Sequence, residues 1–336
     1  MKGSESQRNP NIERMRVIAA LAVVWLHVSV RVIFADPNVE SSGWWAGNVV
    51  DALTRWSVPL FVMISGALLL PGSDQLAPLD FWKKRMLRLL PALIFWTLVY
   101  FAFRFFFEPP FGLKEVIKSL LRGNAYYHTW YLYMLVGLTF ITPFLRKLVA
   151  ALDRRMLLML IGGSFLIFAA EYAYGGRSMT WPPNFLPFTG YFLAGYYLTQ
   201  YPPTIKKRWL LLALILLCGL VIVLATAALL PVRDILAYDI TYSYHNLLVV
   251  TISLSVFLLL IQSRPAVGWW QRIAPVTLGV YAMHPLWIWA LGKLGMDGFT
   301  IHPALGIPLT ATLAFILSAL SAALMSRIPL LKRVVS

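Results

Sequence analysis

The stretch RVIAALAVVWLHVSV, residues 16–30, is apolar enough to form a lipid-spanning helix, yet it carries Arg16 at its start and His27 eleven residues later. An α-helix turns about 100° and rises about 1.5 Å per residue, which places Arg16 and His27 on nearly the same face and about 16 Å apart along the axis. If Arg16 lies at the membrane surface, His27 lies near the middle of a hydrocarbon core about 30 Å thick.

Each of the two residues has a structural explanation beside a functional one. Arg16 fits an ordinary arginine at the cytoplasmic interface. His27 fits a neutral histidine that is hydrogen-bonded to a neighbouring helix. Ionisable side chains at mid-membrane are nevertheless costly and are candidates for function, so His27 is the more informative of the pair.

The composition of the whole chain agrees with a membrane protein. Of its 336 residues 59% are hydrophobic and 13% are charged, whereas an ordinary soluble domain has about 25% charged residues. The single cysteine, Cys218, excludes a disulfide within the chain. Polar residues precede the first apolar segment, which lacks a cleavage site of small residues, so we expect it to be retained as a span.

A spanning helix needs roughly 20 mostly apolar residues, and ten such segments can be found. The sequence therefore predicts an all-α polytopic membrane protein of about ten transmembrane helices. We expect a cytoplasmic N-terminal segment (1–14), one transmembrane domain (15–326) and a cytoplasmic C-terminal tail (327–336). The ten predicted spans are 15–34, 46–70, 88–107, 129–149, 156–174, 183–200, 208–230, 243–262, 276–294 and 304–326.

The distribution of charge predicts the orientation. With a cytoplasmic N-terminus, 20 of the 29 lysines and arginines fall in cytoplasmic segments. This asymmetry follows the positive-inside rule and places both termini in the cytoplasm. The net charge of +15 is thus explained by topology, and we expect no nucleic-acid partner.

A cation at the cytoplasmic surface and a base about 16 Å deeper suit one particular substrate, an extended acyl-coenzyme A. Its phosphates need basic residues near the cytoplasm. Its pantetheine arm would run along the helix and bring the thioester to mid-membrane. Histidine at that depth can accept the proton of an attacking hydroxyl, because its pKa lies near the working pH.

Five motifs in order resemble the membrane acyltransferase-3 family. Its first-span signature is a basic residue, ten further residues and a histidine, as in RVIAALAVVWLH. The others concern the second, third, fourth and ninth predicted spans. The matching stretches are RVIAALAVVWLH (16–27), RWSVPLFVMISGALL (55–69), FWKKRMLRLLPALIFW (81–96), YHTWYLYMLVGLTFITPFL (127–145) and TLGVYAMHP (277–285).

The resemblance implies a function. Members of this family have about ten spans and transfer acyl groups from cytoplasmic acyl-CoA to extracytoplasmic sugars. It implies acetyl-CoA as donor, a cell-surface or lipid-linked sugar as acceptor and a multi-pass location in the bacterial inner membrane. Within the family the chain is most similar to the branch that O-acetylates enterobacterial common antigen.

The residues expected at the donor end are basic. Lys84, Arg85 and Arg88 precede the third span, and Arg85 and Arg88 share a helical face because they are three residues apart. With Arg16 they are candidates to bind the phosphates of coenzyme A. Cytoplasmic positive charge alone explains them equally well.

The residues expected deeper in the membrane are His284, Tyr281 and Arg55. His284 lies at a depth similar to that of His27, and Tyr281 is one turn before it, so these residues can converge on one cavity or form a hydrogen bond between helices. Arg55 can stabilise charge or hold the acceptor. It can equally form an ion pair with Asp51, four residues earlier.

The residues expected to bind the acceptor begin the fourth span on the outer side. His128, Trp130 and Tyr131 offer rings on which a sugar can stack. Aromatic belts are also ordinary features of membrane interfaces, so position alone does not decide between the two interpretations. The family resemblance favours Trp130 as a substrate contact.

The sequence contains no Walker-type glycine loop, no cluster of metal ligands and no G-x-S-x-G motif, so we expect no metal cofactor. The prediction is an O-acyltransferase in which His27 is the general base or carries the acyl group itself. The alternative is a transporter or flippase of a lipid-linked saccharide, which also needs polar residues at mid-membrane. Transporters often show two related halves, and none are visible in this sequence.

Overall fold

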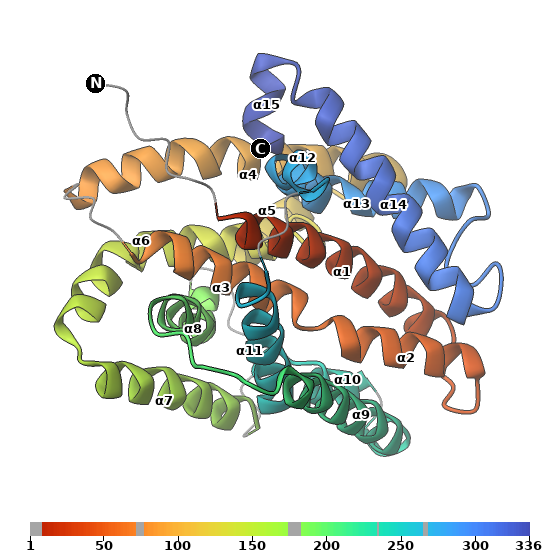
Figure 1. Cartoon of the computed structure of the whole chain (residues 1–336). Coiled ribbons are helices and arrows are strands. Elements are labelled where there is room, and N and C mark those ends of the chain that lie inside the picture. The colour runs from red at the N-terminus through yellow and green to blue at the C-terminus, as the bar shows by residue number, and fades with distance from the viewer. Residues whose placement is uncertain (1–8, 72–76, 174–182, 234, 265–267) are drawn as a thin grey trace.

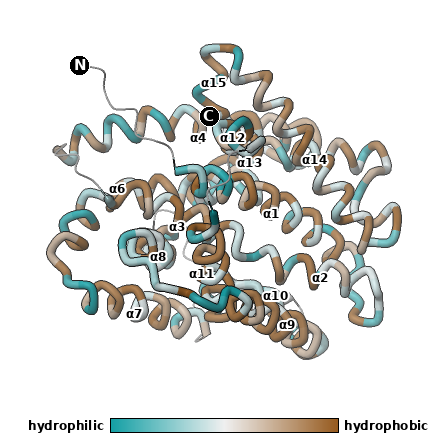
Figure 2. The backbone as a smooth tube through the Cα atoms, viewed as in Figure 1, coloured by the Kyte–Doolittle hydropathy of each residue, from teal (hydrophilic) through white to brown (hydrophobic). Residues whose placement is uncertain are grey.

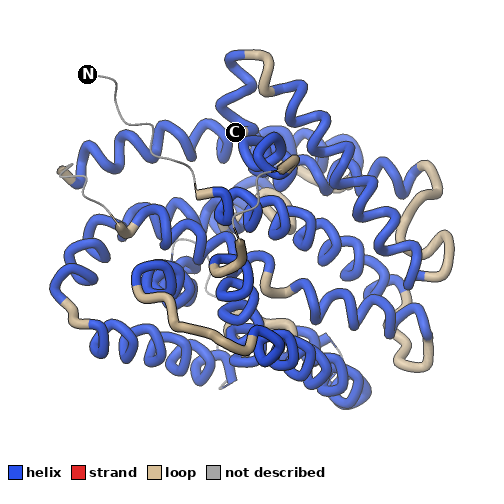
Figure 3. The backbone as a smooth tube through the Cα atoms, viewed as in Figure 1, coloured by secondary structure: helices blue, strands red, loops and turns tan. Residues whose placement is uncertain are grey.

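The computed structural model describes residues 9–71, 77–173, 183–233, 235–264 and 268–336. Within these residues every regular element is a helix, and no strand is present (Figure 3). The elements are α1 (Pro10–Ala35), α2 (Ser42–Thr54), α3 (Ser57–Leu69), α4 (Pro78–Phe107), α5 (Leu113–Arg122), α6 (Trp130–Ala151), α7 (Arg154–Ala173), the 3-10 helix η1 (Pro183–Phe188), α8 (Thr189–Gln200), α9 (Arg208–Arg233), α10 (Ile235–Thr241), α11 (Leu247–Ile261), α12 (Trp270–Ile273), the 3-10 helix η2 (Ala274–Val276), α13 (Thr277–Lys293), α14 (Pro303–Met325) and α15 (Pro329–Val335).

In the described part of the chain, eight helical segments are long and apolar enough to cross a membrane, counting α2 with α3 and α12 with α13. Hydrophobic residues run along α9 and α14, whereas hydrophilic residues gather at turns such as the one between α6 and α7 (Figure 2). The prediction of an all-α polytopic membrane protein is confirmed.

Two of the ten predicted spans are shorter than the sequence indicates. The predicted span 183–200 is divided into η1 and α8, and α8 has 12 residues. The predicted span 243–262 is α11, with 15 residues. At about 1.5 Å per residue these helices extend about 18 Å and 22 Å, less than the roughly 30 Å of a hydrocarbon core. Both pack inside the bundle, α8 against α3 and α11 against α9, so neighbouring helices complete their burial.

The helix that carries Arg16 and His27 lies at the centre of the bundle. α1 packs against α2, α3, α11, α13 and α14 (Figure 1). Asn9 caps it by accepting a hydrogen bond from the backbone N–H of Asn11, which satisfies one of the free donors of the first turn. Met15 and Val24 are completely buried. The central position explains why polar groups on α1 face other helices rather than lipid.

The second predicted span consists of two helices rather than one kinked helix. α2 ends at Thr54 and α3 begins at Ser57, so the break precedes Pro59. Proline fits the first turn of a helix, where its missing N–H would have had no partner. Pro59 therefore belongs to the start of α3, and Arg55 lies at the junction.

Close packing of α3 on α8 explains the small residues of the sequence Ile-Ser-Gly at 64–66. A Cβ atom on Gly66 would lie 1.8 Å from the carbonyl oxygen of Phe192, and one on Gly195 would lie 1.9 Å from that of Met63. Glycine at both positions permits this crossing distance, as small residues do in other membrane helix pairs. The role of Gly66 is therefore packing.

The two ends of the described chain lie at the same end of the bundle, because Asn9 and Ser336 line one cavity. The first eight residues of the predicted N-terminal segment lie outside the described residues. The predicted C-terminal tail is in fact a packed helix. In α15, Val334 and Val335 are buried, and the indole of Trp96 donates a hydrogen bond of 2.8 Å to the carbonyl of Val334.

Candidate active site

Three histidines that are far apart in the sequence meet inside the bundle. His27 comes from α1, His128 from the turn before α6 and His284 from α13. The ring centroids of His27 and His284 are 5.1 Å apart, and the two rings are stacked. The ring centroids of His128 and His284 are 5.3 Å apart, and these two rings meet edge to face. We call His27, His128 and His284 the histidine cluster.

The orientation of His284 follows from the proline beside it. In an α-helix the N–H of residue 285 would bond to the carbonyl of residue 281, but Pro285 has no N–H. The freed carbonyl of Tyr281 instead accepts a hydrogen bond of 2.7 Å from Nδ1 of His284. In the neutral ring Nε2 then carries the lone pair. This nitrogen is buried and has no hydrogen-bond partner within the described part of the chain.

His128 is also buried, beside His284. It is 2% exposed, and burial lowers the pKa of its imidazole well below the usual range, an effect increased by the charges that His284 and His27 would carry. Its Nδ1 is buried without a hydrogen-bond partner among the described residues. The hydroxyl of Tyr281 donates to the main-chain carbonyl of His128, which ties α13 to this turn.

The buried ring nitrogens of His128 and His284 give the cluster its chemistry. A buried polar atom normally has a partner, and one without a partner needs an explanation. A neutral imidazole nitrogen that carries a lone pair accepts a proton or a hydrogen bond. The cluster is therefore built to receive the O–H or N–H group of a ligand.

Tyrosine side chains surround the cluster. The ring of Tyr127 lies 4.9 Å from that of His27, and the ring of Tyr100 lies 4.8 Å from that of His128. Tyr281 contacts His128 at 5.2 Å and His284 at 6.1 Å. These rings fix the histidines by packing from three sides.

A cavity of about 1010 Å³ leads to Tyr281 from the end of the bundle where α1 begins, and we call it the donor cavity. Its basic side chains come from α1, α4 and α15. Tyr131 and Tyr281 form part of its wall, and Tyr281 also belongs to the surroundings of the histidine cluster. The lining residues are Asn9, Ile12, Glu13, Arg16, Phe61, Leu68, Leu87, Arg88, Tyr131, Leu135, Ala274, Pro275, Thr277, Leu278, Tyr281, Lys332, Arg333 and Ser336.

The donor cavity separates the basic residues that the sequence grouped together. Arg16 and Arg88 line it. Arg85, whose guanidinium lies 5.7 Å from the ring centroid of Phe81, and the exposed Lys84 are not part of its wall. Lys332 and Arg333 take their place at the cavity, and sequence reasoning missed both because it treated residues 327–336 as a tail.

Arg55 forms the ion pair that its spacing from Asp51 allows. Two nitrogens of its guanidinium group, Nε and Nη2, donate hydrogen bonds to the carboxylate, and the bond from Nη2 is 2.7 Å long. Asp51 is completely buried. The guanidinium also lies 4.6 Å above the ring centroid of Tyr242. Arg55 is therefore a paired cation at the junction of α2 and α3.

The three residues expected to bind the acceptor lie in three different environments. His128 is part of the buried cluster rather than the outer surface. Tyr131 lines the donor cavity. Trp130 packs against Phe188 and Tyr244, with ring centroids 5.6 Å and 5.8 Å away. The structure thus places His128 in the buried cluster and Tyr131 at the donor cavity, and chain position at the start of α6 indicated neither location.

Among the described residues no group of three or more histidine, cysteine or carboxylate side chains is placed to hold a metal ion.

The fold and the site define a class: a multi-pass membrane protein with a cationic cavity and a cluster of three histidines, which share Tyr281 as a neighbour. A family model, the acyltransferase domain of the acyltransferase-3 family, matches residues 9–327. The chain belongs to this family, and the protein is a membrane acyltransferase. Neither the curated proteins nor the solved structures contain a match to the chain.

Proposed function

We propose that the protein transfers an acetyl group from cytoplasmic acetyl-CoA to a hydroxyl of a cell-surface or lipid-linked sugar, in the bacterial inner membrane. The observation that carries the proposal is the donor cavity, which joins a cationic end to the neighbourhood of the histidine cluster. The family match supplies the acyl-transfer chemistry.

The donor would bind with its phosphates among Arg16, Arg88, Lys332 and Arg333. Charge-assisted hydrogen bonds from arginine to phosphate are stronger than neutral ones and fix the orientation of the ligand. The apolar stretch between the two ends, which includes Phe61 and Leu135, suits the pantetheine arm. The thioester would then lie beside Tyr281.

The reaction would be a direct acyl transfer. His27 accepts the proton of the sugar hydroxyl, the hydroxyl oxygen bonds to the thioester carbonyl carbon, and the carbon–sulfur bond breaks. The departing thiolate of coenzyme A takes up the proton from His27, so the enzyme returns to its starting state. A route through an acyl-histidine uses the same residue as nucleophile and the same leaving group.

The remaining polar groups have complementary roles. Arg55, which pairs with Asp51, would stabilise the oxyanion of the tetrahedral intermediate through its positive charge. Neutral His284 accepts at Nε2 instead of donating, so it suits the incoming hydroxyl better than the oxyanion. Tyr281 already donates to the carbonyl of His128 and positions the turn.

The proposal is tested with purified protein, labelled acetyl-CoA and enterobacterial common antigen, the acceptor of the branch that the sequence most resembles. Loss of thioester together with label in the glycan is the expected result. Binding and translocation of the glycan with acetyl-CoA left intact would instead indicate a transporter. Coenzyme A alone should raise the melting temperature, because it binds the folded state.

A further inference from the structure

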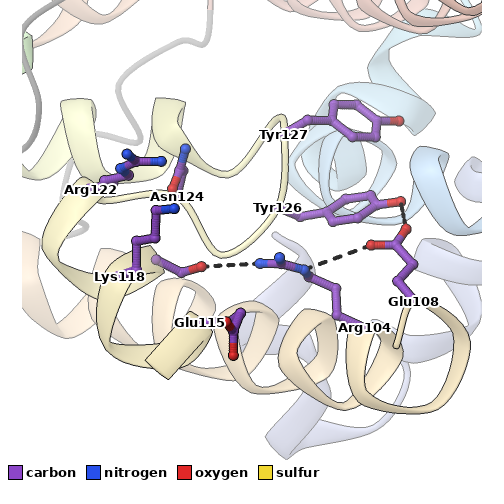
Figure 4. Close-up of a pocket in the computed structure, with 9 residues that line it drawn as sticks. Arg104, Glu108, Glu115, Lys118, Arg122, Asn124, Tyr126 and Tyr127 are labelled. Carbon is purple, nitrogen blue, oxygen red and sulfur yellow. Dashed lines mark hydrogen bonds and ion pairs between the residues drawn. The ribbon is translucent and has the colours of Figure 1, made fainter. Parts of the chain in front are cut away.

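A second pocket lies at the C-terminal end of α4, and we call it the α5 pocket (Figure 4). It has a volume of about 360 Å³ and shares no lining residue with the donor cavity. Its wall is formed by α4, α5 and the turn before α6. The lining residues are Arg104, Glu108, Glu115, Lys118, Ser119, Arg122, Asn124, Tyr126 and Tyr127.

Both carboxylates of the α5 pocket are engaged in structural contacts. Glu108 accepts a hydrogen bond of 2.9 Å from the hydroxyl of Tyr126 and lies 3.7 Å from Nε of Arg104. Glu115 accepts a hydrogen bond of 3.0 Å from the backbone N–H of Gly112 at the start of α5, which lowers the pKa of this carboxyl and keeps it ionised.

Of the three cationic side chains that line the pocket, Arg104 is hydrogen-bonded to the protein, and Lys118 and Arg122 face the interior of the pocket. Arg104 donates to Ser119 at 3.0 Å and to the carbonyl of Ala125 at 3.2 Å, so it braces α5 and the following turn. Lys118 and Arg122 are one turn apart on α5 and exposed. Figure 4 shows both beside Asn124 on one side of the pocket, with Tyr126 and Tyr127 on the other.

The helix α5 is amphipathic, and its apolar face is uncovered. Leu113 and Leu121 are 75% and 69% exposed, and Ile117 and Leu120 share their face. Lys114, Lys118 and Arg122 recur every four residues on the opposite face. A helix of this kind lies in the plane of the membrane interface with its apolar side among acyl chains. The three exposed phenylalanines 105–107 at the end of α4 would lie at the same level.

The position of α5 at the membrane interface determines the depth of the α5 pocket relative to the bilayer. With α5 in the interface, Lys118, Arg122 and Asn124 lie at the level of lipid headgroups, where phosphates are found. Two cations and an amide donor suit a phosphate group. A lipid-linked substrate that keeps its tail beside the apolar face of α5 would bring its phosphate to this point.

The α5 pocket also reaches a neighbour of the proposed base, His27. Tyr127 lines the pocket and its ring lies 4.9 Å from that of His27. The ring of Tyr126 lies 4.6 Å from that of Tyr127, so the two tyrosines form a continuous aromatic wall. A saccharide attached to a phosphate at Lys118 and Arg122 would lie along this wall toward His27.

We propose that the α5 pocket binds the phosphate of a lipid-linked glycan, the acceptor of the acyl group. This inference rests on the proposed function, because it assigns the acceptor of that reaction. Lys118, Arg122 and Asn124 bind the phosphate, Tyr126 and Tyr127 guide the sugar, and the lipid tail lies against the apolar face of α5.

The test is direct binding of labelled farnesyl diphosphate to the full-length protein in phosphatidylcholine nanodiscs. Saturating coenzyme A is present to occupy the donor cavity. The variants Lys118→Gln and Arg122→Gln should each weaken binding about tenfold, as expected for the loss of one charge-assisted contact. The matched control is Lys114→Gln, which removes a cation from the same face of α5 outside the pocket and should change binding less than about twofold.

Competition distinguishes the sources of the phosphate. Unlabelled farnesyl diphosphate should compete far better than inorganic pyrophosphate, and farnesol should compete poorly. Equal competition by pyrophosphate would overturn the lipid-linked source, and equal competition by farnesol would overturn phosphate recognition. An equal loss in Lys114→Gln would show that general surface charge, and not the pocket, is responsible.

This experiment does not depend on acyl transfer. Farnesyl diphosphate binding that is lost in the Lys118 and Arg122 variants supports the pocket even if acetyl-CoA proves not to be the donor. Transfer to a neutral glycan with no binding of farnesyl diphosphate would retain the proposed function and overturn the pocket. Elution profile and melting temperature of each variant check that the exposed substitutions leave the fold intact.

Discussion

The donor cavity and the α5 pocket approach the same histidines from different parts of the molecule and are built differently. The donor cavity, about 1010 Å³, takes its cations from three helices that are far apart in the sequence. The α5 pocket, about 360 Å³, has two cations that face its interior, Lys118 and Arg122, and both come from successive turns of one helix. The first depends on the folded bundle, whereas the second depends on how one amphipathic helix lies at the membrane surface.

The difference corresponds to the two proposed substrates. A long ligand with several phosphates needs a deep cavity with cations at one end, and several helices must converge to build it. A lipid-linked acceptor stays in the membrane and needs only a phosphate contact at headgroup level. Tyr281 on one side and Tyr127 on the other bring the two sites to the histidine cluster.

The largest expected effect is that of His27→Ala, which removes the proposed base between the two sites. Transfer to the glycan should fall by at least about 100-fold, as for other general bases. Stabilisation by coenzyme A and binding of farnesyl diphosphate should persist, since neither phosphate site is changed. The measurement is the initial rate with labelled acetyl-CoA beside both binding assays.

The control for this variant is His302→Asn. His302 caps α14 by accepting a hydrogen bond of 3.3 Å from the N–H of Ala304, and it is not a member of the histidine cluster. Asparagine is a good N-cap residue and preserves this contact. Full transfer activity in His27→Ala, or an equal loss in His302→Asn, would remove His27 from the mechanism.

A smaller effect is expected from Arg88→Gln, which alters only the donor side. The KM for acetyl-CoA should rise about tenfold, because one charge-assisted contact to phosphate is lost. The kcat and the binding of farnesyl diphosphate should change little. Steady-state kinetics with varied acetyl-CoA at saturating glycan give both constants.

Lys84→Gln is the matched substitution on the same helix. Lys84 is exposed and outside the wall of the donor cavity. The KM of the Lys84→Gln variant for acetyl-CoA should therefore remain within about twofold of that of the unsubstituted protein, as for the loss of a surface charge. If both variants raise the KM equally, the basic residues of α4 act through general charge and the cavity does not select Arg88.

Much of the fold followed from local sequence. Helical periodicity placed Arg16 and His27 on one continuous helix, and the i,i+4 spacing of Asp51 and Arg55 offered their ion pair as one of two alternatives. The break before Pro59 and the shortness of α8 and α11 were missed. Burial by neighbouring helices sets the ends of interior helices, and hydropathy within one segment does not contain that information.

The site was predicted in part. Convergence of His27 and His284 was one of two alternatives, but His128 was placed on the outer surface because it precedes the fourth span. Its burial depends on the turn between α5 and α6 entering the bundle, a long-range contact. Lys332 and Arg333 were missed for the same reason, since the docking of α15 on α4 depends on the hydrogen bond between Trp96 and Val334.

One signal was present in the sequence and was not used. The apolar positions 113, 117, 120 and 121 alternate with cations at 114, 118 and 122 in a helical pattern. The ten-residue helix is too short to span a membrane, so its amphipathic character indicates the interface. Residues 118 and 122 could have been proposed as an outer cation site from that pattern alone.

The central claim is that donor and acceptor reach the histidine cluster from opposite ends of the bundle, and vectorial transfer tests it most directly. The protein is reconstituted in liposomes, and a label at position 84, which is exposed and outside the wall of the donor cavity, reports its orientation. Acetylated glycan should form when acetyl-CoA is on the side of Arg88 and Ser336 and the lipid-linked saccharide is presented on the side of α5. Product formed only when both substrates share one side of the membrane would contradict the account.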